Sequence, residues 1–225
     1  MPDQTAIGGE IQPMPQRVVT AYQRRTKLVP FKQGGIDGLC GLYAVFNACA
    51  YLFPGLLEPY EENADTLGHK LADALTDSEF KDAWLNGTEL PIVERWVAAA
   101  EQFLSGQGRR SERVEAHCSE AQTVDEYWDC LEHLIGTRKD ERCVAVVGFG
   151  DPDPHWTCVV GVTDKAIELF DSSMYTSEKR AKTTLPKDAR DDLWVVEPES
   201  TVVLSRLGHR LVADAEAAQR WTAFA

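Results

Sequence analysis

An apolar run from Leu39 to Phe53 is the strongest hydrophobic pattern in the chain. Asn47 is its only clearly polar side chain, and Pro54-Gly55 follows it directly. A helix that is apolar on nearly every face lies inside a core, and proline and glycine end helices. The pattern therefore predicts a buried helix over these residues, in which Asn47 serves a structural polar network.

Other helical patterns in the first two thirds of the chain are amphipathic, with apolar residues three and four positions apart. They cover residues 64–75, 92–104 and 123–136. The last begins with the sequence Thr123-Val124-Asp125-Glu126, which has the form of a capping box, and ends near Gly136. We expect the first half of the chain to be helical.

After residue 142 the pattern changes to short β-rich segments separated by proline, glycine and aspartate. These segments are Cys143–Phe149, Trp156–Val162, Ala166–Phe170, Leu193–Val196 and Thr201–Leu204. Helices followed by strands predict an α+β domain, in which an N-terminal helical layer with a buried helix packs against a C-terminal antiparallel sheet.

Length and composition suit one folded domain. The 225 residues include 44% hydrophobic residues, which is enough for a substantial core. Prolines and glycines interrupt residues 1–17, so we expect a flexible tail there and a single domain over residues 18–225. An Ala-rich stretch over residues 213–225 predicts a terminal helix.

Acidic residues dominate the charge of the chain, with 36 Asp and Glu against 23 Lys and Arg and a net charge of −13. Such a molecule repels phosphate backbones and anionic lipids, so nucleic acid and membrane are not expected partners. The sequence also shows no secretory signal and no membrane span. We expect a cytoplasmic protein, although export by a route without a cleavable signal stays open.

Six scattered cysteines in such a protein predict reduced thiols rather than a disulfide framework. Cys143 and Cys158 fall inside apolar strands and Cys49 inside the buried helix, where thiols act as small hydrophobes. A zinc set built from His117, Cys118, Cys130 and His133 matches no familiar spacing. We expect no metal and no cofactor.

Cys40 differs from these cysteines because it follows the polar loop Gln33-Gly34-Gly35-Ile36-Asp37-Gly38 and opens the buried helix. Backbone N–H groups and the positive end of the helix dipole stabilise a sulfur anion at this position, and the thiolate is the attacking species. The glycines would shape the loop and let a substrate backbone approach the sulfur. Cys40 is the predicted nucleophile.

A thiolate needs a histidine base, and that histidine needs an acceptor to orient it. His155 lies after a Pro-rich turn and just before a strand, and a hairpin centred near residue 163 would place Asp171 directly opposite it. We expect Asp171 to accept the Nδ1–H of His155. Trp156 is expected in the core or as a wall over this pair, and Asp151 and Asp153 as turn residues that would favour basic substrates if they rim a cleft.

Acyl transfer also needs donors for the oxyanion. The backbone N–H of Cys40 is one donor, and the side-chain amide of Gln33 is the candidate for the second.

The order Gln33, Cys40-Gly41, His155-Trp156 and Asp171-Ser172 resembles that of papain-like cysteine peptidases. In layout it looks most like the bacterial peptidases that process leader peptides after a double glycine, with Asp in place of the Asn of papain. Similar local motifs occur in ubiquitin-like-protein proteases, but there the His and Asp come first. Gln33 also lies one residue farther from the cysteine than in papain.

This resemblance implies a thiol protease that cleaves peptide or isopeptide bonds in protein or peptide substrates, with a regulatory protein as a further partner. Two alternatives stay open from the sequence. One is an acyltransferase or transglutaminase-like enzyme that uses the same triad. The other is a catalytically silent module that keeps the fold for binding or regulation.

Overall fold

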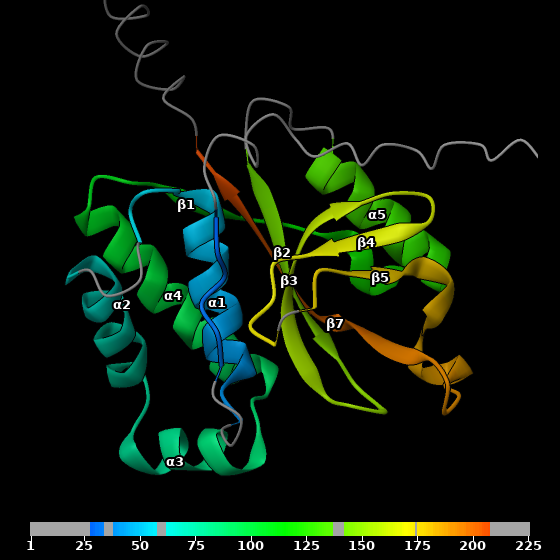
Figure 1. Cartoon of the computed structure of the whole chain (residues 1–225), viewed down its shortest axis with the longest axis horizontal. Coiled ribbons are helices and arrows are strands. Elements are labelled where there is room, and N and C mark those ends of the chain that lie inside the picture. The colour runs from blue at the N-terminus through cyan, green and yellow to red at the C-terminus, as the bar shows by residue number, and fades with distance from the viewer. Residues whose placement is uncertain (1–27, 34–37, 58–61, 137–141, 174, 208–225) are drawn as a thin grey trace, which may run out of the picture.

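The computed structural model describes residues 28–33, 38–57, 62–136, 142–173 and 175–207. Figure 1 shows one sheet with helices α1 to α4 on one face and α5 on the other. The helices are α1 (Cys40–Leu52), α2 (Glu62–Asp73), α3 (Asp77–Asn86), α4 (Leu90–Gly106) and α5 (Val124–Gly136), and the strands are β1 (Ser111–Val114), β2 (Cys143–Phe149), β3 (His155–Val162), β4 (Ala166–Leu169), β5 (Ser177–Lys179), β6 (Thr183–Thr184) and β7 (Trp194–Arg206).

Three short 3-10 helices complete the described elements: η1 (His117–Glu120), η2 (Arg180–Lys182) and η3 (Pro186–Asp188). The strand order is β1-β7-β2-β3-β4-β5, with antiparallel pairs throughout, and β6 pairs with β7 in parallel. The α+β class predicted from the sequence is confirmed.

Alternating side chains of β2 enter two different cores, because successive residues of a strand point to opposite faces. Val144 and Val146 pack on the side of α1, whereas Ala145 and Val147 pack with Trp128 of α5. All seven residues of β2 are buried as a result. The helices thus form layers on both faces of the sheet rather than the single layer that we expected.

Helix α1 confirms the predicted buried helix. Asn47 is fully buried on it and holds an N-terminal segment of the chain: its Oδ1 accepts from the backbone N–H of Phe31 at 2.7 Å, and its Nδ2 donates to the Phe31 carbonyl at 3.2 Å. Because the Asn47 amide is hydrogen-bonded to both backbone groups of Phe31, this polar side chain can be buried in a core helix. The structural role predicted for Asn47 is confirmed.

Helix α3 is absent from the sequence-based prediction, because Ala83 is its only fully buried residue and an amphipathic period is therefore missing. Its local signal is a capping box. The Glu79 N–H donates to the Thr76 hydroxyl, and the Glu79 carboxylate accepts from the Thr76 N–H at 2.8 Å. Glu79 also pairs with Arg95 of α4 at 2.6 Å, which fastens α3 to α4.

The remaining predictions of secondary structure have mixed outcomes. The two predicted segments 193–196 and 201–204 are parts of one strand, β7, which begins at Trp194, and the sequence does not predict the short strands β1, β5 and β6. The expected tail over residues 1–17, the start of the domain at residue 18 and the helix at 213–225 lie outside the described residues.

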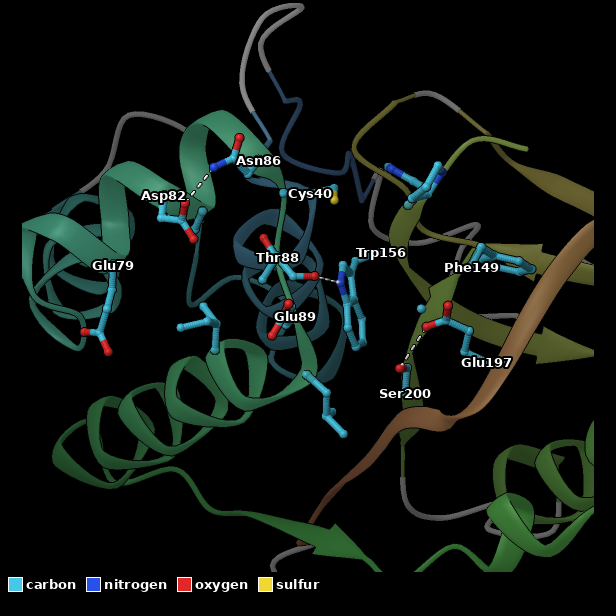
Figure 2. A pocket seen from close by; sticks show the side chains of 17 residues that line it. Cys40, Glu79, Asp82, Asn86, Thr88, Glu89, Phe149, Trp156, Glu197 and Ser200 are labelled. Carbon is cyan, nitrogen blue, oxygen red and sulfur yellow. Dashed lines mark hydrogen bonds between the residues drawn. The ribbon is translucent and has the colours of Figure 1, made fainter. Parts of the chain in front are cut away.

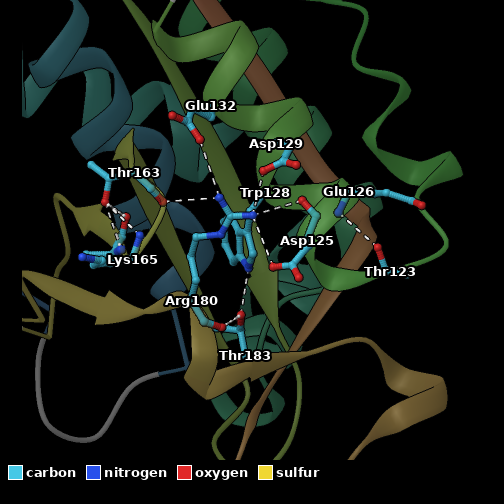
Figure 3. Close-up of polar contacts among 11 residues, drawn as sticks. Thr123, Asp125, Glu126, Trp128, Asp129, Glu132, Thr163, Lys165, Arg180 and Thr183 are labelled. Atoms are coloured by element: carbon cyan, nitrogen blue, oxygen red, sulfur yellow. Dashed lines mark hydrogen bonds and ion pairs between the residues drawn. The ribbon is translucent and has the colours of Figure 1, made fainter.

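A buried arginine links α5 to the edge of the sheet (Figure 3). Only 9% of the Arg180 side chain is exposed, and its guanidinium group lies 2.8 Å from Asp129, 3.4 Å from Asp125 and 3.6 Å from Glu132. Beside it, the Trp128 indole N–H donates to the Thr183 hydroxyl at 2.8 Å. Together these contacts hold α5 against β6.

Cys118 of η1 and Cys130 of α5 form a disulfide, with their Cα atoms 5.7 Å apart. The expectation of reduced thiols is wrong for this pair, because the packing of η1 on α5 brings together two cysteines whose pairing the sequence does not reveal. The described histidine, cysteine and acidic side chains form no group of three that could hold a metal ion. None of the described helices is long and apolar enough to span a bilayer.

Candidate active site

Cys40 is the first residue of α1, and 7% of its surface is exposed. Its sulfur lies 3.8 Å from the carbonyl oxygen of Gly38. The first N–H groups of a helix have no partner within the helix, so the backbone at Cys40 can donate outward. The expected position of the sulfur at the start of a buried helix is confirmed.

The loop before Cys40 is held by the end of α3. The Gly38 N–H donates to the Trp84 carbonyl at 2.8 Å, and the Gly38 carbonyl accepts from the Thr88 hydroxyl at 3.2 Å. A Cβ added at Gly38 would lie 2.8 Å from the backbone atoms Ala83 O and Gly87 N. No side chain fits there.

Gly41, on the other side of Cys40, is equally crowded, since a Cβ there would lie 2.8 Å from the Thr88 methyl group. Gly38 and Gly41 thus let the nucleophile segment pack against the chain itself. The expectation that they open space for a substrate backbone is wrong for these two, and Gly34 and Gly35 lie outside the described residues.

His155 and Asp171 are in contact, with His155 Nε2 2.7 Å from Asp171 Oδ2. Only 11% of the His155 side chain and none of the Asp171 side chain is exposed. Two details differ from the prediction. The carboxylate binds Nε2 rather than Nδ1, which leaves Nδ1 as the ring nitrogen available to Cys40, and Cys40 contributes to the raised pKa of His155.

The second difference is the register of the hairpin. Val159 pairs with Leu169, and the Phe170 N–H donates to the Cys158 carbonyl, so Asp171 comes across from Thr157 rather than from His155. An irregularity between Val159 and Gly161 shifts the pairing. Because residues two apart share a face, Asp171 still reaches His155 along the diagonal.

Burial is the largest influence on His155 and disfavours its protonation, but contacts with Asp171 and Cys40 outweigh it and raise the pKa of His155 to about 9. Burial also works against the charge of Asp171, yet the hydrogen bond and the charge of His155, together with a hydrogen bond from the Ser173 N–H, hold the pKa of Asp171 below its ordinary value. The arrangement favours an imidazolium beside a carboxylate near neutral pH.

Gln33 lies beside the segment that carries the carboxylate. Its N–H donates to the Ser172 carbonyl at 3.3 Å, and its Oε1 accepts from the Ser172 hydroxyl at 3.5 Å. Two residues before Gln33, the backbone of Phe31 is hydrogen-bonded to the Asn47 side chain, which holds this segment against α1. The structure thus places Gln33 against Ser172, the residue after Asp171, and Gln33 is not among the described residues that share a cleft with Cys40 and His155.

Tyr175 packs on the outer side of His155, with the two ring centroids 6.2 Å apart in an edge-to-face arrangement. Trp194 packs against Tyr175 in the same way, with ring centroids 5.7 Å apart. Sequence reasoning missed this residue because it lies in a loop beyond the strands. Trp156 joins the core, as expected, and does not wall the His155–Asp171 pair: its indole N–H donates to the Thr88 carbonyl at 2.7 Å.

A cleft of about 510 Å³ opens between α3, the start of α4 and the sheet. Cys40, His155 and Trp156 all line it, together with Gly148 of β2 and Ser200 of β7. Figure 2 shows Cys40 close to the Thr88–Trp156 hydrogen bond, which joins the helical side of the cleft to the sheet side. The cleft is large enough for a short stretch of polypeptide.

Other cysteines do not compete for this role. Cys49 and Cys158 are fully buried, and burial, as the largest cause, raises the pKa of Cys49 to about 12 and the pKa of Cys158 well above its usual range. Cys143 is buried in β2. The predicted core role of these three residues is confirmed.

Comparisons with family models, with curated proteins and with solved structures found no match for this chain.

Proposed function

We propose that the protein is a cysteine peptidase in which Cys40 is the nucleophile, His155 the acid and base, and Asp171 the group that orients His155. The observation that carries the proposal is the convergence of Cys40 and His155 on one cleft, with Asp171 buried behind the imidazole. Peptide or isopeptide bonds are the proposed substrates.

In the first half of the reaction the Cys40 thiolate attacks the carbonyl carbon, and the carbonyl π electrons move to oxygen. The Cys40 N–H and the Gln33 amide are the proposed donors to this oxyanion. As the oxyanion collapses, the C–N bond breaks, and His155 gives its proton to the departing amine. A thioester remains on Cys40.

In the second half, neutral His155 takes a proton from water, and the hydroxide attacks the thioester. The C–S bond then breaks, the carboxylic acid leaves, and the thiolate pairs again with the imidazolium. Asp171 stays ionised and fixes the ring, in keeping with its lowered pKa.

The test uses a mixture of peptides from a digested proteome, incubated with the wild-type protein and with Cys40→Ser, His155→Ala and Gln33→Ala. We expect new termini from the wild type, a rate about 10²-fold lower for Gln33→Ala, and no cleavage by Cys40→Ser or His155→Ala. Cleavage by Cys40→Ser at the wild-type rate would overturn the proposal. Thioester transfer to an added amine in preference to water would assign the acyltransferase reaction instead.

A further inference from the structure

The two walls of the cleft carry three carboxylates that form no ion pair with another described residue. Glu89 stands at the start of α4, Asp82 on α3, and Glu197 on β7 across the cleft. In Figure 2, Glu89 and Glu197 lie on opposite sides of the hydrogen bond between Thr88 and Trp156. No lysine or arginine is among the described residues that line the cleft.

The hydrogen-bond partners of two of these carboxylates are neutral side chains. Asp82 accepts from the Asn86 amide at 2.6 Å and Glu197 from the Ser200 hydroxyl at 3.0 Å, and neither donor carries a positive charge that would offset the carboxylate. Glu79 differs, since Arg95 pairs with it at 2.6 Å and, as the largest cause, lowers its pKa to about 2.

The catalytic residues themselves add no net positive charge to the cleft. The His155 imidazolium is paired with Asp171, and its positive charge also faces the Cys40 sulfur. The net field in the cleft therefore comes from Asp82, Glu89 and Glu197. A cleft with low-dielectric walls and charges of one sign concentrates ligands of the opposite sign.

We infer that the substrate is a cationic polypeptide segment, with lysine or arginine side chains on both sides of the bond that Cys40 attacks. Asp82 and the pair Glu89 and Glu197 are the groups that bind these side chains. The inference rests on the proposed peptidase function and names its substrate class. Asp151 and Asp153, which the sequence suggested as acidic residues at the rim, do not line the cleft. The negative charge of the cleft comes from other carboxylates.

One test uses the best-cleaved peptide of the digested proteome as the probe. Its arginines are replaced by citrulline and its lysines by acetyl-lysine, which remove the charge and preserve most of the shape. We expect kcat/KM to fall by roughly tenfold for each cation that contacts a carboxylate in the cleft, and the loss to shrink at high salt. Equal kcat/KM for charged and neutral peptides would overturn the inference.

Matched variants locate the effect. Glu89→Gln, Glu197→Gln and Asp82→Asn keep the shape and the hydrogen-bond acceptors but remove one charge each. Glu94→Gln serves as the control, because Glu94 is exposed on α4 and does not line the cleft. The three cleft variants are expected to lose preference for the charged peptide, and the control to keep it. An unchanged preference in all three would contradict the inference.

A reaction that needs no peptidase activity separates the inference from the proposed function. Cys40 is treated with methanethiosulfonates that carry a trimethylammonium or a sulfonate group; the thiolate forms a disulfide, and methanesulfinate leaves. Relative to a small free thiol, the cationic reagent should react roughly tenfold faster than the anionic one, and this ratio should drop in Glu89→Gln/Glu197→Gln. Equal rates for the cationic and the anionic reagent would contradict the inference. A strong preference for the cationic reagent without cleavage of any peptide would contradict the proposed peptidase function instead.

Discussion

The backbone N–H of Gly38 donates to the carbonyl oxygen of Trp84 at 2.8 Å, so the end of α3 holds the loop that presents Cys40. The Gly38 carbonyl accepts from Thr88, whose own carbonyl accepts from Trp156 of β3. A continuous chain of contacts thus joins the segment of the nucleophile to the strand that begins with His155. The geometry of the site depends on α3 as much as on α1.

Gly38→Ala should therefore disturb both stability and activity. The added methyl group would meet backbone at 2.8 Å, and overpacking of this kind costs about 1–3 kcal/mol. We expect a lower melting temperature and a lower kcat. Gly106→Ala, at an open position on α4, is the control and should be neutral or slightly stabilising. Equal behaviour of the two variants would show that the loop is not held as described.

The raised pKa of His155 predicts the alkaline limit of activity. The imidazolium gives a proton to the leaving group, so kcat/KM should fall as pH rises through about 9. Asp171→Asn removes the charge that helps to raise this pKa, so the alkaline limb should move to lower pH. Steady-state profiles of both proteins give the measurement. Identical alkaline limbs would mean that Asp171 does not control the protonation of His155.

The same pKa has a consequence for stability. His155 titrates near 9 in the folded state and near 6.5 when unfolded, so its charge stabilises the fold fully below pH 6.5, and this stabilisation is lost as pH rises to about 9. The shift corresponds to about 3 kcal/mol. Urea unfolding at pH 6 and pH 9.5 should show a fall in the free energy of unfolding that His155→Gln lacks. A wild-type curve without this fall would contradict the assignment.

Asn47→Leu tests the anchor of Gln33. The change leaves the N–H and the carbonyl of Phe31 without their partner, and an unsatisfied buried group costs about 1–3 kcal/mol. We expect lower stability together with a reduced kcat, because the segment that carries Gln33 would no longer be fixed beside Ser172. If kcat stays at the wild-type value, the Asn47–Phe31 contact is not what positions Gln33 for the reaction.

Arg180→Met tests the link between α5 and the sheet. The variant keeps much of the apolar stem but loses the hydrogen bonds to the carbonyls of Thr163 and Asp125, so the free energy of unfolding should fall by about 2 kcal/mol. Asp129→Asn should change it by less than about 1 kcal/mol, because 68% of that side chain is exposed. A larger loss for Asp129→Asn would place the stabilising contact in the ion pair instead.

The sequence predicts those elements that bury apolar side chains in a clear pattern. Helix α1 and strand β2 are nearly continuous in apolar residues because both lie at the centre of the molecule. The hydrophobic pattern does not predict helix α3, because Ala83 is its only buried residue. The capping residues Thr76 and Glu79 nevertheless mark its start. A search for caps as well as for periodicity would have found it.

The candidate site was predicted in its residues and less well in its geometry. Cys40 and His155 line one cleft and Asp171 contacts His155, as expected, whereas Gln33 is not among the described residues that line this cleft. The irregularity in β3 changes the register of the hairpin, and the Asp171 carboxylate contacts Nε2 of His155 rather than Nδ1. Local sequence carries no signal for such shifts. The place of Tyr175 over His155 and the Cys118–Cys130 disulfide likewise depend on contacts between distant segments.

The central claim is that His155, held by Asp171, activates Cys40. The rate of Cys40 alkylation by iodoacetamide between pH 5 and pH 10, read by intact mass, tests it most directly in the wild type, His155→Ala and Asp171→Asn. Activation predicts a fast wild-type reaction that persists below pH 7 and a rate that His155→Ala lowers at least about tenfold at neutral pH. Superimposed profiles for the wild type and His155→Ala would contradict the account.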